Sequence, residues 1–201
     1  MIPTPPNSTP HHDPRGQPSA WVARFAPLVT RGGAVLDVAC GGGRHARLFH
    51  GAGHPVTAVD IDPRGVADLA GQPGVTILQA DLEGGTPVAL GGPYAGIVVT
   101  NYLHRPLLSR LPSLLAPGGL LLYETFAQGN QRHGRPSSPG FLLRDGELLD
   151  LARETGLQVV AFEQGETALP RAAVVQRLAA VRPLAAPDLD GDPEPRPLPL
   201  A

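Results

Sequence analysis

The sequence contains no lysine, and all 16 basic residues among its 201 are arginines. Schiff-base enzymes, lysine-dependent short-chain dehydrogenases and P-loop kinases all need an amine that this chain lacks, so these mechanisms are excluded. The single cysteine, Cys40, cannot form an intramolecular disulfide and fits a reducing compartment. No apolar run approaches the roughly 18 residues of a membrane span, and the first residues lack the order of a secretory signal. We therefore expect a cytoplasmic protein that makes no membrane contact.

Excess basic charge is also missing. The chain has 16 basic and 18 acidic residues, a net charge of −2 and a pI of about 6.4. A protein that holds a long polyanion usually has a basic excess, so we do not expect nucleic acid as a partner. A lone cysteine cannot supply a Cys-x-x-Cys ligand pair, and we expect no catalytic metal.

Composition predicts one domain with two irregular ends. Hydrophobic residues make up 42% of the chain, which suits a single globular domain, placed over residues 19–182. Residues 1–18 are proline-rich without periodicity and should be disordered or form a flap. Within them His11 and His12 could bind a metal or cover a site, and a solvated tail is the simpler interpretation. Residues 183–201 combine prolines with scattered acids and predict a disordered tail.

The stretch Val35 to Phe49, VLDVACGGGRHARLF, organises the chain. An apolar run carries one acid, Asp37, breaks into three glycines, and continues as a helix-compatible run with an apolar face. This order predicts strand, tight turn and helix, the start of a parallel α/β unit. Glycine permits positive φ and close approach of backbone to a ligand, and the helix N-terminus leaves amide groups free to bind one.

The other apolar runs continue this pattern. They predict strands over 54–60, 75–82, 94–101, 120–126, 157–163 and 171–181, and helices over 20–30, 106–116 and 144–155, with another beginning at Pro63. Glu83 to Pro93 is glycine-rich and should form turns. Residues 127–140 lack an apolar pattern, and a loop this long inside a domain predicts a functional lid or a disordered segment, of which we favour the lid.

Acidic residues end the first three strands. Asp60 ends the second, where a carboxylate can accept both hydroxyls of an adenosine ribose, and Asp81 ends the third, within reach of an adenine amino group. This ordered set resembles the class I S-adenosylmethionine-dependent methyltransferases. Asp37 to Gly43 matches that family's motif (acid)-x-Gly-x-Gly-x-Gly, except that Ala39 replaces the first glycine.

The resemblance implies a fold and a cofactor site. The fold is a Rossmann-like α/β methyltransferase fold, with a seven-stranded, mostly parallel sheet in the order 3-2-1-4-5-7-6, an antiparallel last strand, and helices on both faces. The cofactor is S-adenosyl-L-methionine, which leaves as S-adenosyl-L-homocysteine. Its expected contacts are Asp37, Ala39, Gly41, Gly43, Arg44, Asp60, Ile61, Asp81, Leu82 and Asn101.

A polar cluster follows the fourth strand, where ligands of open parallel sheets bind. His104 is the candidate general base, with Tyr102 and Glu124 as alternatives, because all three belong to the carboxyl rim of the sheet. Arg105 beside them, and Arg132 and Arg135 in the 127–140 loop, are candidate substrate contacts.

The run TNYLHRPLL and the sequence after it resemble one bacterial branch of these enzymes, loosely labelled tellurite-resistance-like. We therefore predict methyl transfer by in-line displacement to a small molecule, including chalcogen oxyanions or thiols, in a monomer or homodimer. The alternatives are an RNA or protein methyltransferase, a non-catalytic S-adenosylmethionine-binding protein and, third, a dehydrogenase.

Overall fold

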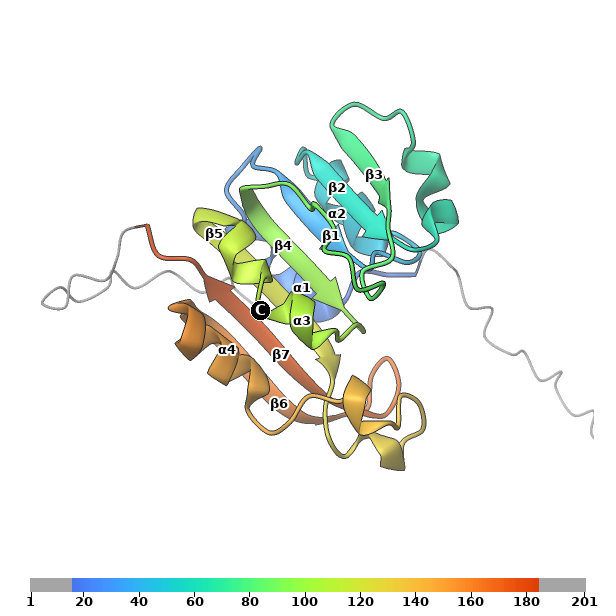
Figure 1. Cartoon of the computed structure of the whole chain (residues 1–201), viewed down its shortest axis with the longest axis vertical. Coiled ribbons are helices and arrows are strands. Elements are labelled where there is room, and N and C mark those ends of the chain that lie inside the picture. The colour runs from blue at the N-terminus through green and yellow to red at the C-terminus, as the bar shows by residue number, and fades with distance from the viewer. Residues whose placement is uncertain (1–15, 185–201) are drawn as a thin grey trace, which may run out of the picture.

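A computed structural model describes residues 16–184 of the chain, in which seven strands form one sheet in the order β3-β2-β1-β4-β5-β7-β6 (Figure 1). All neighbours pair in parallel except β5 with β7 and β6 with β7, which are antiparallel. The predicted fold class is therefore confirmed. The strands are β1 (Val35–Val38), β2 (Val56–Asp60), β3 (Val75–Gln79), β4 (Tyr94–Thr100), β5 (Leu115–Phe126), β6 (Gln158–Thr167) and β7 (Ala173–Val181).

Helices cover both faces of the sheet. Figure 1 shows α3 (Arg105–Leu108) and α4 (Glu147–Thr155) in front of the sheet, and α1 (Ala20–Phe25) and α2 (Arg44–Gly51) behind it. Neighbouring strand residues point to opposite faces, so each strand contributes to two separate cores. In β4, for example, Ile97 packs in the core under α3 and α4, whereas Val98 packs in the core under α1 and α2.

Three predicted helices are wrong in extent or type, and the one expected over 144–155 begins only at Glu147. The helix expected over 106–116 ends as α3 at Leu108 and resumes only as a 3₁₀ turn, Leu111–Leu114. The helix expected over 20–30 ends at Phe25 and continues as a 3₁₀ turn, Ala26–Leu28. Pro112 and Pro27 interrupt these segments because proline has no N–H to donate and its ring clashes with the preceding turn. The segment beginning at Pro63 is also 3₁₀, kinked at Val66.

The predictions for the two chain ends fall almost entirely on residues 1–15 and 185–201, including His11 and His12, which lie outside the described residues. Of the predicted tails, Gly16–Pro18 and Pro183–Leu184 are described and belong to no helix or strand. Within residues 16–184, none of the helices has the length and apolar character to cross a membrane.

Candidate active site

The turn between β1 and α2 has a backbone that suits a bound ligand. Ala39, Gly41 and Gly43 have φ values of +51°, +52° and +72°, all in the left-handed region. A methyl group added at Gly43 would lie 2.2 Å from Cγ1 of Val66, whereas one added at Gly41 would meet nothing within 4 Å. Gly43 is therefore required by packing, and the open space at Gly41 is available to a ligand. Alanine at position 39 costs about 1–2 kcal/mol for its left-handed conformation.

Asp60 connects the turn to the end of β2. Its Oδ2 accepts a hydrogen bond of 2.7 Å from the amide of Gly41, and its Oδ1 accepts one of 2.9 Å from the amide of Asp62. A carboxylate has about four lone-pair positions, so about two remain available to a ligand. Two acceptor positions match the two hydroxyls of a ribose.

Asp81 follows β3 and is held in a similar way. Its Oδ1 accepts a 2.9 Å hydrogen bond from the amide of Glu83, which leaves acceptor capacity on Oδ2. The neighbouring Ile61, after β2, is 62% exposed although it is a large apolar residue. An exposed apolar side chain between two strand-end acids is suited to the face of a flat apolar ring.

A cleft of about 480 Å³ brings these groups together, within the size range of small-molecule sites. Five of the predicted cofactor contacts line it, together with Ala80, Glu83 and Tyr102; the five are Ala39, Asp60, Ile61, Asp81 and Leu82.

Asp37 does not reach this cleft. It is 1% exposed, and its Oδ2 accepts a 2.9 Å hydrogen bond from the amide of Ala46 in the first turn of α2. Burial raises the pKa of Asp37 to about 7, although the Ala46 amide and the nearby Arg44 act in the opposite direction. In this structure Asp37 supports the helix start below the glycine turn.

The N-terminal segment closes over the same edge of the sheet. The Ser19 hydroxyl donates a 2.6 Å hydrogen bond to Oε2 of Glu124, and the Ser19 amide donates one of 3.1 Å to Nε2 of His45. Burial, followed by the nearby Arg44, lowers the pKa of His45 to about 3, so the ring is neutral and can accept this bond. Arg44 itself donates to the Thr100 hydroxyl at 3.4 Å.

Glu124, a candidate base, is already engaged. Besides the Ser19 hydroxyl it faces Nε of Arg177 at 3.3 Å, and its side chain is 13% exposed. Alternate residues of β5 face opposite sides of the sheet, and Glu124 lies on the side of α1, with Leu120 and Leu122. The rim position was predicted, but its partners were not.

A second cavity of about 200 Å³ lies at the carboxyl ends of β4 and β5. It shares Glu83 and Tyr102 with the first cleft. Among the predicted residues it contains Asn101, whose φ is +56°, and Tyr102. The Tyr102 hydroxyl is buried near the Glu83 carboxylate and makes no hydrogen bond of normal geometry among the described residues. The remaining lining residues are Leu103, Thr125, Phe126, Pro136 and Phe141.

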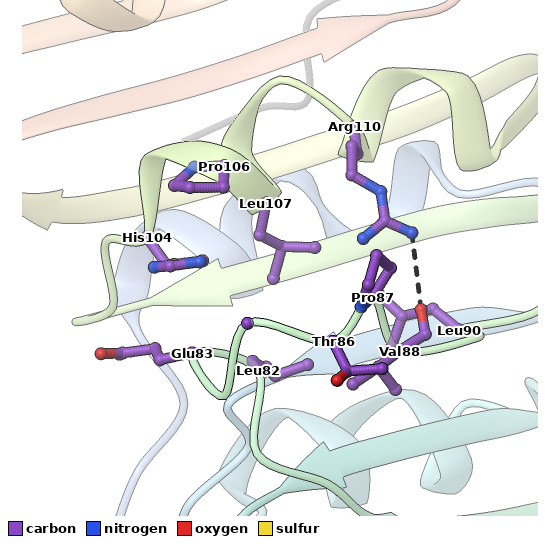
Figure 2. Close-up of a pocket in the computed structure, with 11 residues that line it drawn as sticks. Leu82, Glu83, Thr86, Pro87, Val88, Leu90, His104, Pro106, Leu107 and Arg110 are labelled. Atoms are coloured by element: carbon purple, nitrogen blue, oxygen red, sulfur yellow. Dashed lines mark hydrogen bonds between the residues drawn. The ribbon is translucent and has the colours of Figure 1, made fainter.

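His104 lines a third cleft, of about 300 Å³, between the segment 82–90 and α3 (Figure 2). This cleft runs from Glu83 and His104 at one end to Arg110 at the other, where the guanidinium donates to the carbonyl of Val88 at 3.4 Å. His104 therefore lines a different cleft from Asn101 and Tyr102, and Glu83 lines both.

The predicted substrate arginines differ in their environments. Arg105 forms two hydrogen bonds with Glu147, of 2.7 and 2.9 Å, and donates to the carbonyls of Gly140 and Leu142. It therefore holds the end of the 127–140 loop against α4. Arg132 and Arg135 are exposed on that loop, and Arg135 precedes Pro136 of the second cavity.

Sequence reasoning missed Glu83, Ser19 and His45. Glu83 lines all three cavities, but it opens a glycine-rich stretch interpreted only as turns. Its place two residues after the strand-end acid Asp81 was the available signal. His45 and Ser19 are 26 residues apart, and no local pattern connects them.

Comparisons with known proteins agree with this architecture. A profile described as a methyltransferase domain matches residues 11–162. An uncharacterized methyltransferase of Mycobacterium tuberculosis is 34% identical over 137 residues, which are 64% of this chain and 64% of that protein. The chain thus matches somewhat less than two thirds of the length of its curated relatives.

Solved structures share the fold at lower identity. TehB from Haemophilus influenzae has a TM-score of 0.64 at 18% identity, covering 80% of this chain and 61% of that one. The 1,6-didemethyltoxoflavin-N1-methyltransferase of Burkholderia thailandensis, crystallised with 1,6-didemethyltoxoflavin and S-adenosylhomocysteine, has a TM-score of 0.60 at 21% identity, covering 81% and 76%.

Proposed function

The chain belongs to the methyltransferase domain family, and on that premise we propose that it transfers the methyl group of S-adenosylmethionine to a small-molecule acceptor. S-adenosylmethionine supplies a methyl group on a positively charged sulfur, which is already activated for displacement. The protein then has to bind the donor, align the acceptor and exclude water. Alignment of this kind can contribute roughly 7–11 kcal/mol of the barrier reduction.

The observation that carries the proposal is the 480 Å³ cleft with its two strand-end acids beside the glycine turn. Asp60 would hold the ribose with the acceptor positions that the Gly41 and Asp62 amides leave free. Asp81 would accept from the adenine amino group. Gly41 would let the backbone approach the ligand, and Arg44 in the first turn of α2 would face the carboxylate of the methionine part.

The acceptor is proposed to be small because the second cavity, at about 200 Å³, lies below the roughly 300–1,000 Å³ of sites for drug-sized ligands. The net charge of −2 also favours a small acceptor over RNA. The Burkholderia enzyme, which has a similar fold, is named for methylation of a small molecule. The likeness to TehB concerns the fold alone and does not assign a chalcogen acceptor.

Calorimetry tests the donor site. We expect S-adenosylmethionine and S-adenosylhomocysteine to bind and NAD not to bind. In Asp81→Asn the side-chain oxygen can keep the Glu83 amide bond, while its NH₂ group would face the adenine amino group as donor against donor. The dissociation constant should rise at least tenfold, which is about 1.4 kcal/mol.

The matched control is Asp150→Asn on the exposed face of α4, which removes the same charge far from the cleft. Equal affinity of the two variants for S-adenosylhomocysteine would refute the assignment of Asp81. NAD binding in place of the sulfonium donor would favour a dehydrogenase. Methyl transfer to RNA that disappears at high salt would favour the nucleic-acid alternative.

A further inference from the structure

We propose that Glu83 recognises the methyl acceptor, and that the acceptor presents an N–H or O–H group to this carboxylate rather than an oxyanion. The inference rests on the proposed function and assigns the substrate class of the same site.

Glu83 lies where the three cavities meet. It lines the cofactor cleft with Asp81, the second cavity with Tyr102, and the third cleft with His104. Figure 2 shows Glu83 and His104 at the same end of the third cleft. The backbone of Glu83 is fixed by the 2.9 Å hydrogen bond from its amide to Asp81. A residue beside the cofactor cleft and at the entrance to the neighbouring cavities is placed to contact whatever approaches the transferred methyl group.

The second cavity is the better acceptor site of the two that adjoin the cofactor cleft. It lies at the carboxyl ends of β4 and β5, at the edge of an open parallel sheet where ligands bind. The third cleft instead extends away from that edge, toward Leu90 and Arg110. The walls of the second cavity include Phe126 and Phe141, which suit a flat apolar molecule.

The polar groups of this cavity suit a neutral methyl acceptor that forms hydrogen bonds. The Tyr102 hydroxyl is buried beside the Glu83 carboxylate and makes no hydrogen bond of normal geometry among the described residues, so a ligand in the cavity would meet both groups together. Burial and then Glu83 raise the pKa of Tyr102, which keeps the hydroxyl protonated as a donor. The Glu83 carboxylate is a charged hydrogen-bond acceptor for an N–H or O–H group of the substrate, and a charged acceptor forms stronger hydrogen bonds than a neutral one.

The charges around the cavity oppose an oxyanion. None of the described residues that line it is an arginine or a histidine, and Asp60 and Asp81 lie in the adjoining cleft with Glu83. The nearby Arg105 is held by Glu147 and by two backbone carbonyls. An anionic acceptor would therefore meet the like charge of Glu83 without a cationic side chain in the cavity wall, and such juxtaposition favours the neutral competitor.

The test uses three probes of matched size on the complex with S-adenosylhomocysteine: aniline, phenol and benzoate. Their binding is measured by amide chemical-shift titration with the wild type, Glu83→Gln and the control Glu154→Gln, an exposed charge on α4. We expect aniline and phenol to bind the wild type at least tenfold more tightly than benzoate. The Glu83→Gln variant should narrow this preference to about threefold or less, and Glu154→Gln should keep it.

Glu83 is exposed, so the glutamine variant should fold, and its thermal unfolding is recorded alongside. Benzoate binding the wild type as tightly as aniline, a preference unchanged in Glu83→Gln, or no binding by any probe would each overturn the inference while the donor site stands. Failure of S-adenosylhomocysteine itself to bind would instead overturn the proposed function, and this inference with it.

Discussion

The glycine turn offers a test in which two neighbouring substitutions of the same kind should affect different properties. Gly41 and Gly43 both have left-handed φ values, so alanine at either costs about 1–2 kcal/mol. In Gly41→Ala the new methyl group meets nothing within 4 Å. The loss of folding free energy should therefore be about 1–2 kcal/mol, from the backbone alone.

Gly43→Ala adds a steric term. Its methyl group would lie 2.2 Å from Cγ1 of Val66, a buried residue, and 3.1 Å from the Arg47 guanidinium. Overpacking of this kind costs roughly 1–3 kcal/mol, which brings the total to about 2–5 kcal/mol. At about 2–4 °C per kcal/mol for a domain of this size, Tm should fall by roughly 4–20 °C, against about 2–8 °C for Gly41→Ala.

Gly41→Ala, the variant expected to lose less stability, should be the one that binds the cofactor more weakly. The methyl group of Gly41→Ala fills the open space beside the cofactor cleft, so its dissociation constant for S-adenosylhomocysteine should rise at least tenfold, or about 1.4 kcal/mol. Thermal unfolding without ligand and calorimetry with S-adenosylhomocysteine measure the two effects separately. Wild-type affinity in Gly41→Ala, or a Tm in Gly43→Ala no lower than in Gly41→Ala, would refute this account of the turn.

Three further predictions concern the groups that support the site. The substitution Arg105→Ala, which removes one partner of the Arg105–Glu147 pair, should lower the free energy of unfolding in denaturant by about 2–3 kcal/mol. This is at or below the low end for buried pairs because Arg105 is 36% exposed. The affinity for S-adenosylhomocysteine should not change, and weakened cofactor binding at unchanged stability would contradict this structural role of Arg105. The folded-state pKa of Asp37 is raised to about 7, so its contribution to stability is fully present below the unfolded pKa of 3.8 and is lost as the pH rises to about 7. Asp37→Asn should remove this dependence of the unfolding free energy on pH, measured by unfolding at a series of pH values, and a variant with the same pH dependence as the wild type would disprove the assignment. Ser19→Ala removes the N-cap of α1 and the bond to Glu124, and should lower stability by about 1 kcal/mol in the same assay, whereas an unchanged midpoint would show that the cap contributes nothing.

Helix ends were the weakest part of the sequence prediction. The strands followed from apolar runs, and their order and direction in the sheet, which the family resemblance implied, are confirmed. The expected helix over 106–116 failed because hydrophobic spacing continued through Pro112, and the apolar side chains there pack equally well from a 3₁₀ turn. The spacing of hydrophobic residues predicts which residues are buried. It predicts less well whether the backbone between them forms α-helical or 3₁₀ hydrogen bonds.

Some residues of the candidate site could likewise be placed from the sequence, and others could not. Asp60 and Asp81 could be placed from the sequence because each ends a strand, and the carboxyl ends of parallel strands meet at one edge of a sheet. The roles of Arg105 and Glu124 could not, because their partners lie 42 and 105 residues away: Glu147 for the first and Ser19 for the second.

The strands, the glycine turn and the positions of the strand-end acids could be predicted from the order of residues along the chain, since they depend on local conformation and on strand burial. The order of the strands in the sheet was expected from the family resemblance. Which polar groups face a cavity, and which are bound by other side chains, became known only from the folded structure. Packing between segments distant in the chain makes that choice: it placed His104 in a separate cleft and Glu83 where three cavities meet.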